Sequence, residues 1–268
     1  IVDVSNSTFI KNQVTSKYGV NYGGVFYVTN GGQLTINHSS FINNSASKIE
    51  GTYGPKGGVI YATGANSNII INDSSFTNNI AESNDDVASV AGAIFLDYNV
   101  KLQLTNSNFT DSVASQDGGA ILIAGTYTGN ITDCNFINNT AGAGGAIYAG
   151  ANANGLLNVT GSNFINNTAI TGNGGAIVTS SNTIVNNSTF INNTAITGNG
   201  GAIYESSVNN YIEVINSTFE SNTANSGGAV YSLGNVNITN SSFTDNNANI
   251  DGGAVYSNGD VNVKDSNF

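Results

Sequence analysis

Few residues of this chain combine the side chains and the spacing that catalysis requires. Hydrolysis of a glycosidic bond uses two carboxylates about 5 to 9.5 Å apart, and the sequence has one local acidic cluster, Glu82, Asp85 and Asp86. A lyase that acts on acidic sugars also needs a cation near the sugar carboxylate, and the chain has no arginine. We therefore predict a solvated loop at this cluster and no enzymatic activity. A carbohydrate-active lyase or hydrolase is the alternative.

Histidine and cysteine each occur once in the chain. His38 has no second histidine with which to bind a metal ion or to build a catalytic triad. Cys134 has no Lys or His nearby in sequence to activate its thiol. We predict a turn residue at His38, a serine-like filler at Cys134, and no cofactor or metal site.

The composition excludes several kinds of partner. With six Lys, no Arg and a net charge of −11, the chain lacks the cations that neutralise phosphates, so we expect no nucleic-acid binding. The same charge disfavours an anionic membrane surface. No run of 18 apolar residues is present, so we expect no membrane insertion by this segment.

One phrase recurs along the whole chain and must position any site. Phe-Ile-Asn-Asn-Thr-Ala at 164–169 is followed by Gly-Gly-Ala-Ile at 174–177, and both return at 190–195 and 200–203. Aligned on the phenylalanine, the repeats are 24 to 35 residues long, nine are complete, and a tenth has begun. Such self-similarity indicates a solenoid in which each repeat packs on its neighbours.

Aligned columns reveal the local structure of one repeat. The positions five and seven residues before the phenylalanine are almost all aliphatic and alternate with polar residues, which is the pattern of a β-strand. Three residues before it stand mainly Asn, Asp or Gly, which tolerate a left-handed turn. One repeat therefore holds about three short strands separated by tight bends.

Stacking such repeats gives an all-β fold, a right-handed parallel β-helix with about nine coils. Phe and Asn columns should form buried ladders, in which each asparagine amide bonds to the next. The ladder residues that we predict are Phe9, Phe41, Phe76, Phe109, Phe136, Phe164, Phe190, Phe219 and Phe243, with Asn139, Asn167 and Asn193.

The first three repeats are longer than the others at one corner. The loops 13–22, 45–56 and 80–90 follow the asparagine column in consecutive repeats, so they must lie next to one another. Loops on a rigid scaffold are common binding sites. The candidate binding residues of this loop corner are Lys17, Tyr18, Tyr22, Lys48, Glu50, Tyr53, Lys56, Glu82, Asp85 and Asp86.

A second candidate surface is an aromatic ribbon, one residue after the aliphatic position of Gly-Gly-Ala-Ile. Alternation places this column on the outside of the coil, where it could bind sugar rings or a partner. A cross-strand stack that only stabilises the sheet is the alternative. The ribbon comprises Tyr27, Tyr61, Phe95, Tyr148, Tyr204, Tyr231 and Tyr256.

Asn-x-Ser/Thr motifs are frequent, as expected for a chain rich in these residues. Only a few that point outward could carry a glycan. The candidates are Asn37, Asn72, Asn130, Asn158 and Asn237.

The paired motifs Phe-x-x-Asn and Gly-Gly-Ala-[Ile/Leu/Val] resemble the repeats of the chlamydial polymorphic outer-membrane proteins. The denser phrase Phe-Ile-Asn-Asn-Thr-Ala is similar to repeats of the adhesin-like surface proteins of methanogenic archaea. The resemblance covers the whole chain and implies an exported, right-handed β-helical stalk used in adhesion. The chain departs from the motif at Ala91, which replaces the first glycine, and at Val25 and Val59, which replace the alanine.

These observations predict a non-enzymatic adhesin at the cell surface, outside the cell, whose loops bind a glycan or protein of a host or neighbouring cell. A purely structural fibre or sheath subunit is the alternative. The chain opens in a strand pattern at Ile1 and ends at Phe268 inside a repeat. We therefore expect residues 1–268 to be one β-helix domain cut from a longer protein, with open strand edges that allow end-to-end self-association.

Overall fold

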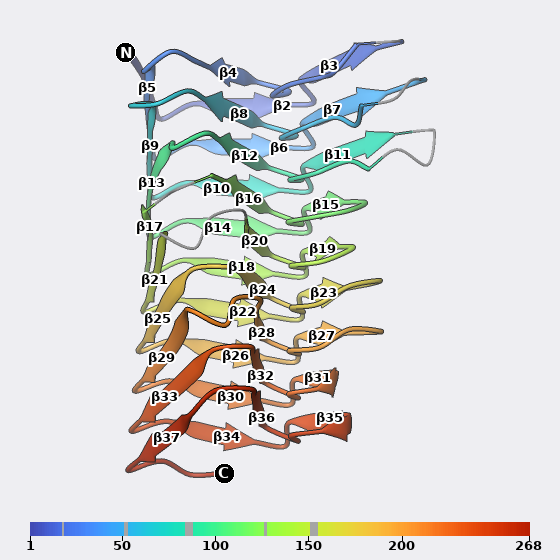
Figure 1. Cartoon of the computed structure of the whole chain (residues 1–268). Helices are drawn as coiled ribbons and strands as arrows, with labels where there is room; N and C mark the ends of the chain where they lie inside the picture. The colour runs from blue at the N-terminus through green and yellow to red at the C-terminus, as the bar shows by residue number, and fades with distance from the viewer. Residues whose placement is uncertain (18, 51–52, 84–87, 126–127, 151–154) are drawn as a thin grey trace.

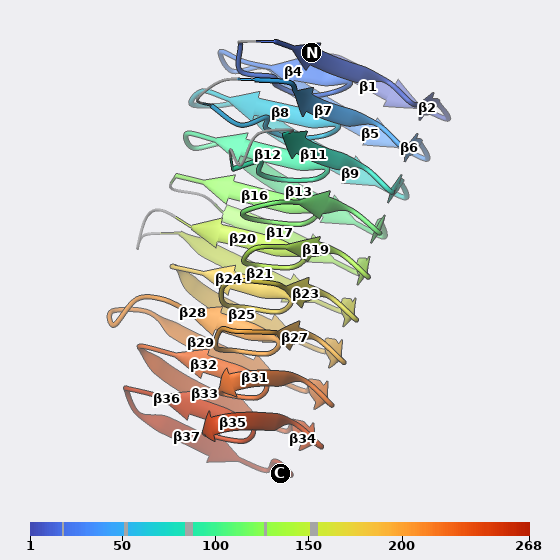
Figure 2. The same cartoon turned by 90° about the vertical axis from the view of Figure 1, so that its right-hand side faces the viewer.

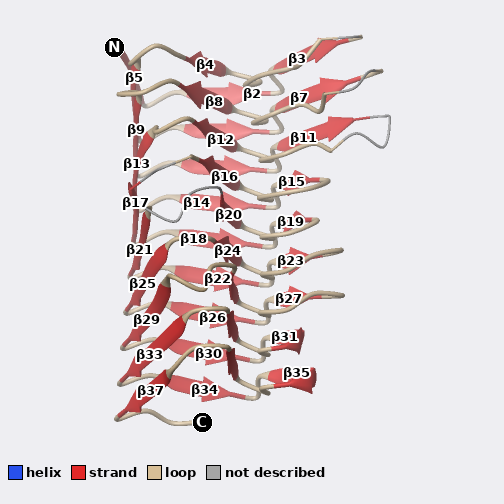
Figure 3. Ribbon diagram, viewed as in Figure 1, coloured by secondary structure: helices blue, strands red, loops and turns tan. Residues whose placement is uncertain are grey.

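The computed structural model describes residues 1–17, 19–50, 53–83, 88–125, 128–150 and 155–268. These residues form strands, turns and loops without a helix, so none of them belongs to a helix that could cross a membrane. The strands stack into four parallel sheets, and each coil adds one strand to each sheet (Figures 1 and 3). The predicted parallel β-helix of about nine coils is confirmed.

The first sheet contains the strands of the aliphatic columns, which have five residues each except β1 and β37 with four. It is built from β1 (Val2–Ser5), β5 (Gln33–Asn37), β9 (Asn68–Asn72), β13 (Lys101–Thr105), β17 (Thr128–Thr132), β21 (Leu156–Thr160), β25 (Asn182–Asn186), β29 (Tyr211–Ile215), β33 (Asn235–Thr239) and β37 (Val261–Lys264).

The second sheet carries the phenylalanine column. It is built from β2 (Thr8–Ile10), β6 (Ser40–Ile42), β10 (Ser75–Thr77), β14 (Asn108–Thr110), β18 (Asn135–Ile137), β22 (Asn163–Ile165), β26 (Thr189–Ile191), β30 (Thr218–Glu220) and β34 (Ser242–Thr244).

The third sheet follows the buried asparagine. It is built from β3 (Gln13–Ser16), β7 (Ser45–Lys48), β11 (Ile80–Ser83), β15 (Val113–Ala114), β19 (Thr140–Ala141), β23 (Thr168–Ala169), β27 (Thr194–Ala195), β31 (Thr223–Ser226) and β35 (Asn247–Asp251).

The fourth sheet follows the glycine pair. It is built from β4 (Phe26–Val28), β8 (Ile60–Thr63), β12 (Ile94–Asp97), β16 (Ile121–Ala124), β20 (Ile147–Gly150), β24 (Ile177–Thr179), β28 (Ile203–Glu205), β32 (Val230–Ser232) and β36 (Val255–Ser257).

The phenylalanine column forms the predicted ladder. Phe76, for example, pairs in register with Phe41 and Phe109, and successive rings lie 4.6–5.0 Å apart from Phe9 to Phe268. The rings from Phe41 to Phe243 are buried, while Phe9 in the first coil is half-buried. They pack with the aliphatic columns of the first and fourth sheets into one continuous core, because coils in register place like side chains above one another.

The predicted asparagine ladder is also present and fully buried. Asn139 Nδ2 donates to Asn167 Oδ1 and to the carbonyl oxygen of Phe109, both at 3.0 Å. Asn167 and Asn193 repeat this arrangement. Ser112 interrupts the ladder in the fourth coil, and its buried hydroxyl has no hydrogen-bond partner. The ladder thus satisfies buried polar groups that would otherwise be costly.

Turn residues with positive φ separate the strands. His38 and Asp73 occupy the predicted turn column with φ of 47° and 50°. A second column with positive φ, which includes Asn43 and Asn78, follows the phenylalanine by two residues and was not predicted. The glycine pair supplies a third bend, where Ala91 takes φ of 60° in place of glycine.

The third sheet is the main departure from the expected coil, which had about three strands. Its strands leave the body of the coil and form a flange at one side (Figure 1). Ala169, Ala195 and Ala224 form a small core of their own within the flange, separate from the phenylalanine core. Small side chains allow the outgoing and returning chain to approach closely here.

Candidate functional site

The three predicted long loops lie side by side at one end of the flange. They begin with β3, β7 and β11, which pair in parallel and reach farthest from the body of the coil (Figure 1). Figure 2, which faces the flange, shows β7 and β11 one above the other. The returning chain is also paired, through bridges that join Tyr22, Lys56 and Val90. In the eighth coil, by contrast, β31 ends at Ser226, directly before the glycine pair. The loop corner is therefore a structure that the other coils do not need.

A row of side chains connects the loops, with the buried Ser47 between the exposed Gln13 and Glu82. Gln13 Nε2 donates to Ser47 Oγ at 3.3 Å, and Ser47 Oγ donates to Glu82 Oε1 at 3.1 Å. Lys17 Nζ lies 3.9 Å from Glu50 Oε2, and both side chains are more than half exposed. An exposed ion pair of this kind adds little stability.

Buried polar groups hold the loops from inside. Lys48 is only 1% exposed, and its amine donates to the carbonyl oxygen of Tyr53. The buried Asn21 donates its amide to the carbonyl oxygen of Ser47. The prediction of Lys48 as a contact residue is therefore wrong, because its amine is used within its own loop.

Four predicted residues of the corner face solvent. They are Lys17, Glu50, Tyr53 and Glu82, and the Tyr53 side chain is 68% exposed. Tyr18, Asp85 and Asp86 lie outside the described residues. Within the described part of the chain, no group of three or more His, Cys, Asp or Glu side chains could bind a metal ion.

The aromatic ribbon is covered where it passes the loop corner. The ring centroid of Tyr22 lies 4.3 Å from that of Tyr61, and Lys56 Nζ lies 4.8 Å from the ring centroid of Phe95. As a result, Tyr61 and Phe95 are each only 5% exposed, whereas Tyr27 in the first coil is 55% exposed. Tyr61 and Phe95 point away from the central core, as predicted, but the returning chain packs over them, so neither forms part of an exposed surface.

Burial affects the acid–base properties of this covered part. Burial, with Tyr27 and Asp97 nearby, raises the pKa of Tyr22. Burial also raises the pKa of Tyr61, whose hydroxyl donates to Asp97 Oδ2 at 3.1 Å. Desolvation raises the pKa of Asp117, in the fourth coil, to about 6. The covered ribbon is thus an apolar environment with neutral tyrosines.

The later part of the ribbon is half-exposed but presents ring edges. Tyr204, Tyr231 and Tyr256 stack with centroid distances of 5.1 and 4.6 Å, so each ring face between them is covered by the next ring. Leu122 and Val178 separate Tyr148 from the stacks on either side. This geometry favours the alternative of a stabilising stack, since sugar rings bind to free ring faces.

All five candidate glycosylation sites point outward from the first sheet and are half-exposed. Their amides bond between coils, as in Asn72 Nδ2 to Asn37 Oδ1 at 2.9 Å and Asn158 Nδ2 to Asn130 Oδ1 at 2.9 Å. Asn237 accepts from Asn262 Nδ2 at 3.0 Å. A glycan on Asn72 or Asn158 would therefore attach to an amide nitrogen that is already a donor.

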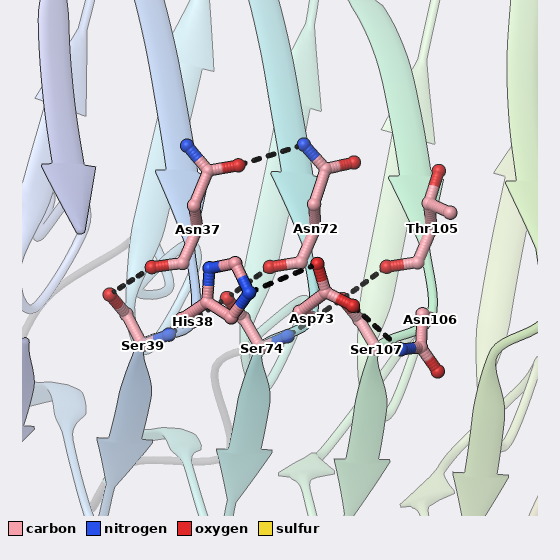
Figure 4. A network of polar contacts seen from close by, with 9 residues as sticks. All are labelled: Asn37, His38, Ser39, Asn72, Asp73, Ser74, Thr105, Asn106 and Ser107. Atoms are coloured by element: carbon pink, nitrogen blue, oxygen red, sulfur yellow. Dashed lines mark hydrogen bonds and ion pairs between the residues drawn. The ribbon is translucent and has the colours of Figure 1, made fainter. Parts of the chain in front are cut away.

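The single cysteine and histidine have the structural roles that the sequence predicts. Burial raises the pKa of Cys134 to about 11, and its Sγ donates to the carbonyl oxygen of Thr132, as Ser162 Oγ does to Thr160. His38 lies in a turn, with Nε2 3.5 Å from Asp73 Oδ2 (Figure 4).

Sequence reasoning missed one buried carboxylate, Glu205. It accepts hydrogen bonds from the backbone N–H of Ser207, from Ser232 Oγ and from the N–H of Gly234. Burial nevertheless raises its pKa. The matching positions in the next two coils are Ser232 and Ser257, which bond to the N–H two residues further on. The column of Glu205, Ser232 and Ser257 is polar where the first five coils are apolar, and this change in the sequence could have revealed the buried carboxylate.

Comparison with known proteins supports the repeat assignment. Residues 38–63, 133–150, 187–204 and 216–233 match the family model of the Chlamydia polymorphic membrane protein repeat. No curated protein and no solved structure is significantly similar to the chain. The matched segments span the turn, the phenylalanine ladder and the glycine pair described above. The chain is therefore a parallel β-solenoid with repeats similar to those of the Chlamydia polymorphic membrane proteins, which fits a role as a surface protein.

Proposed function

We propose that this chain is a non-enzymatic segment of an extracellular adhesin, and that its loop corner binds a protein or glycan on a host or neighbouring cell. The repeat type and the β-helix fold support a surface role. Adhesion is a further step, and the loop corner is the feature that supports it.

The observation that carries this proposal is the paired structure of the described parts of three loops, which the solenoid itself does not require. Ordering a loop costs conformational entropy, and burying the Lys48 amine costs desolvation. Both costs are absent where β31 leads directly into the glycine pair. A binding surface is a reason for such a structure, and the exposed side chains Lys17, Glu50 and Tyr53 suit one, because Tyr is enriched at interfaces.

The experiment removes the loops without touching the ladders. Deleting residues 16–20, 48–54 and 83–88 leaves five residues between the asparagine column and the glycine pair, as in the fourth coil. Binding of the parent and the variant to host cells and to a glycan array is measured, and thermal unfolding verifies that the variant folds. We expect binding to be lost. Undiminished binding by a folded variant would refute the assignment to the loop corner.

A gentler variant keeps all coils intact. Lys17→Ala, Glu50→Ala and Tyr53→Asn are combined, and the matched control combines Lys264→Ala, Glu220→Ala and Tyr98→Asn at exposed positions elsewhere. Asparagine replaces both tyrosines because Tyr98 has a positive φ. We expect at least a tenfold loss of affinity in the first variant only, which corresponds to about 1.4 kcal/mol.

A purely structural stalk is the alternative, and the regular stacking of the later coils favours it. The fourth to ninth coils have short connections and a continuous phenylalanine ladder, and the asparagine ladder is continuous from the fifth coil. If this alternative is correct, the loop deletion changes neither cell binding nor assembly. Release of reducing sugars from polysaccharides would instead support an enzyme.

A further inference from the structure

A shallow polar groove occurs twice at the same bend of the coil, between the first and second sheets. One stretch, of about 350 Å³, lies over the second to fourth coils and is lined by His38, Asp73 and Ser75 among others. The other, of about 440 Å³, lies over the last coils and is lined by Asn240, Ser242 and Asp265 among others. Neither contains a residue of the loop corner, so this site is independent of the function proposed above.

The local fold explains the groove. In the second to fourth coils the left-handed turn residue, such as Asp73, points outward, while the serine that follows turns its hydroxyl back into the bend (Figure 4). Ser74 Oγ donates to the carbonyl oxygen of Asn72 at 2.7 Å, and Ser107 Oγ does the same to Thr105 at 2.8 Å. Small serines thus form the floor, and the turn residues and first residues of the second-sheet strands form the walls.

The lining offers hydrogen bonds and negative charge. Asp73 Oδ1 accepts from Asn106 Nδ2 at 2.6 Å, and the side chain remains 39% exposed. Asp265 occupies the same turn column in the second stretch. Carboxylates, amides and hydroxyls bind sugar hydroxyls and amino groups, whereas the net charge of −11 repels polyanions.

The bend and its serine floor repeat along the rod at the strand spacing of about 4.8 Å, while the wall residues change from coil to coil but stay polar. Pyranose units in an extended β-linked chain advance by a similar distance, so successive sugars can each meet the polar groups of one coil. We propose that this bend groove binds a linear polysaccharide without negative charge, with its chain running parallel to the rod axis.

The test uses the full chain and defined hexasaccharides. Calorimetry measures binding of the β-1,4-linked N-acetylglucosamine hexamer, its deacetylated form and hexagalacturonate. We expect the first two to bind and the polyanion not to bind. Absence of binding by the first two, or equal binding of hexagalacturonate, would overturn the proposal.

Matched variants locate the site on the chain. The double variant Ser75→Phe, Ser242→Phe places a phenylalanine side chain in each stretch of the groove, since Ser75 lines the first and Ser242 the second. The control is Thr77→Phe with Thr244→Phe, which lie two residues further along the same strands and outside the groove. We expect at least a tenfold weaker affinity in the first pair only. Equal affinities in the two pairs would overturn the proposal.

Two further variants separate charge from shape and this site from the loop corner. Asp73→Asn should weaken binding of the deacetylated hexamer more than binding of the acetylated one, whereas Asp111→Asn, in the second turn column of the following coil, should change neither. Both aspartates have positive φ, which asparagine also tolerates. The loop-deleted chain should bind both hexamers like the parent, so failure of one proposal is distinguishable from failure of the other.

Discussion

Gly175 lies directly against the carbonyl group of Gly201 in the next coil. A Cβ added to Gly175 would be only 2.1 Å from that carbonyl oxygen. The second glycine of the pair has the same relationship in every coil from Gly24 to Gly228, with distances of 2.0 to 2.2 Å. The spacing of the coils thus requires a residue without a side chain at this column.

Gly175→Ala should therefore destabilise the solenoid strongly. The methyl group would meet backbone that cannot move without separating two coils, and we expect a loss of about 3 kcal/mol or more. Gly253→Ala is the matched control, because the nearest atom to its added Cβ is 3.8 Å away; we expect a change within about 0.5 kcal/mol. Urea unfolding measures both, and similar losses for the two variants would contradict this explanation.

Phe164→Ala tests the phenylalanine ladder. Phe164 is fully buried between Phe136 and Phe190, at 4.8 and 4.7 Å, so the neighbours cannot collapse into the space. We expect a loss of about 3–5 kcal/mol in the free energy of unfolding. Ile165→Ala removes the adjacent half-exposed side chain and should cost less than about 1 kcal/mol. A small loss at Phe164 would show that the ring contributes little to the stack.

Ser112→Asn should stabilise the protein. It would remove the unpaired hydroxyl and continue the amide ladder between Asn79 and Asn139, for a gain of about 1 kcal/mol. The reverse change, Asn167→Ser, should interrupt the ladder and cost about 1–3 kcal/mol. Thermal unfolding provides both values, and a neutral Ser112→Asn variant would mean that water already satisfies this site.

Asp117 should make stability depend on pH. Its pKa is raised from an ordinary 3.8 to about 6 in the folded chain, so folding favours the protonated carboxyl. This contribution is complete below pH 3.8 and is lost as the pH rises through about 6. Asp117→Asn should therefore be more stable than the parent at pH 7.5, with a smaller difference at pH 3.5. An equal difference at both pH values, measured by urea unfolding, would contradict the shift.

The sequence predicts the fold well because the same residue pattern recurs in every repeat. Columns such as those of Phe164 and Asn167 combine residue type with a fixed distance, and both lie in ladders as expected. The turn column of Asp73 was equally easy to predict, since few residues accept a positive φ. The two-residue strand Thr168–Ala169 could not be predicted, because two residues cannot show an alternating pattern.

The candidate site was less predictable, because it depends on how loops pack. Sequence spacing places the three loops together, but it does not tell that Tyr22 would cover Tyr61 or that Lys48 would point inward. Those outcomes depend on loop conformation, which the repeat pattern does not predict. The bend groove was not predicted for a different reason. The sequence pattern already explained residues of its walls as turn residues, so nothing pointed to a second role for them.

The backbone hydrogen bonds between coils run parallel to the rod axis, and this has a mechanical consequence. A pull along the axis loads the bonds of one terminal coil first, so the coils should unwind one after another rather than together. The step from Phe164 to Phe190 contains 26 residues, and its release would lengthen the chain by up to about 90 Å. Single-molecule stretching should show a series of such steps, which would let a tethered surface protein extend gradually under shear.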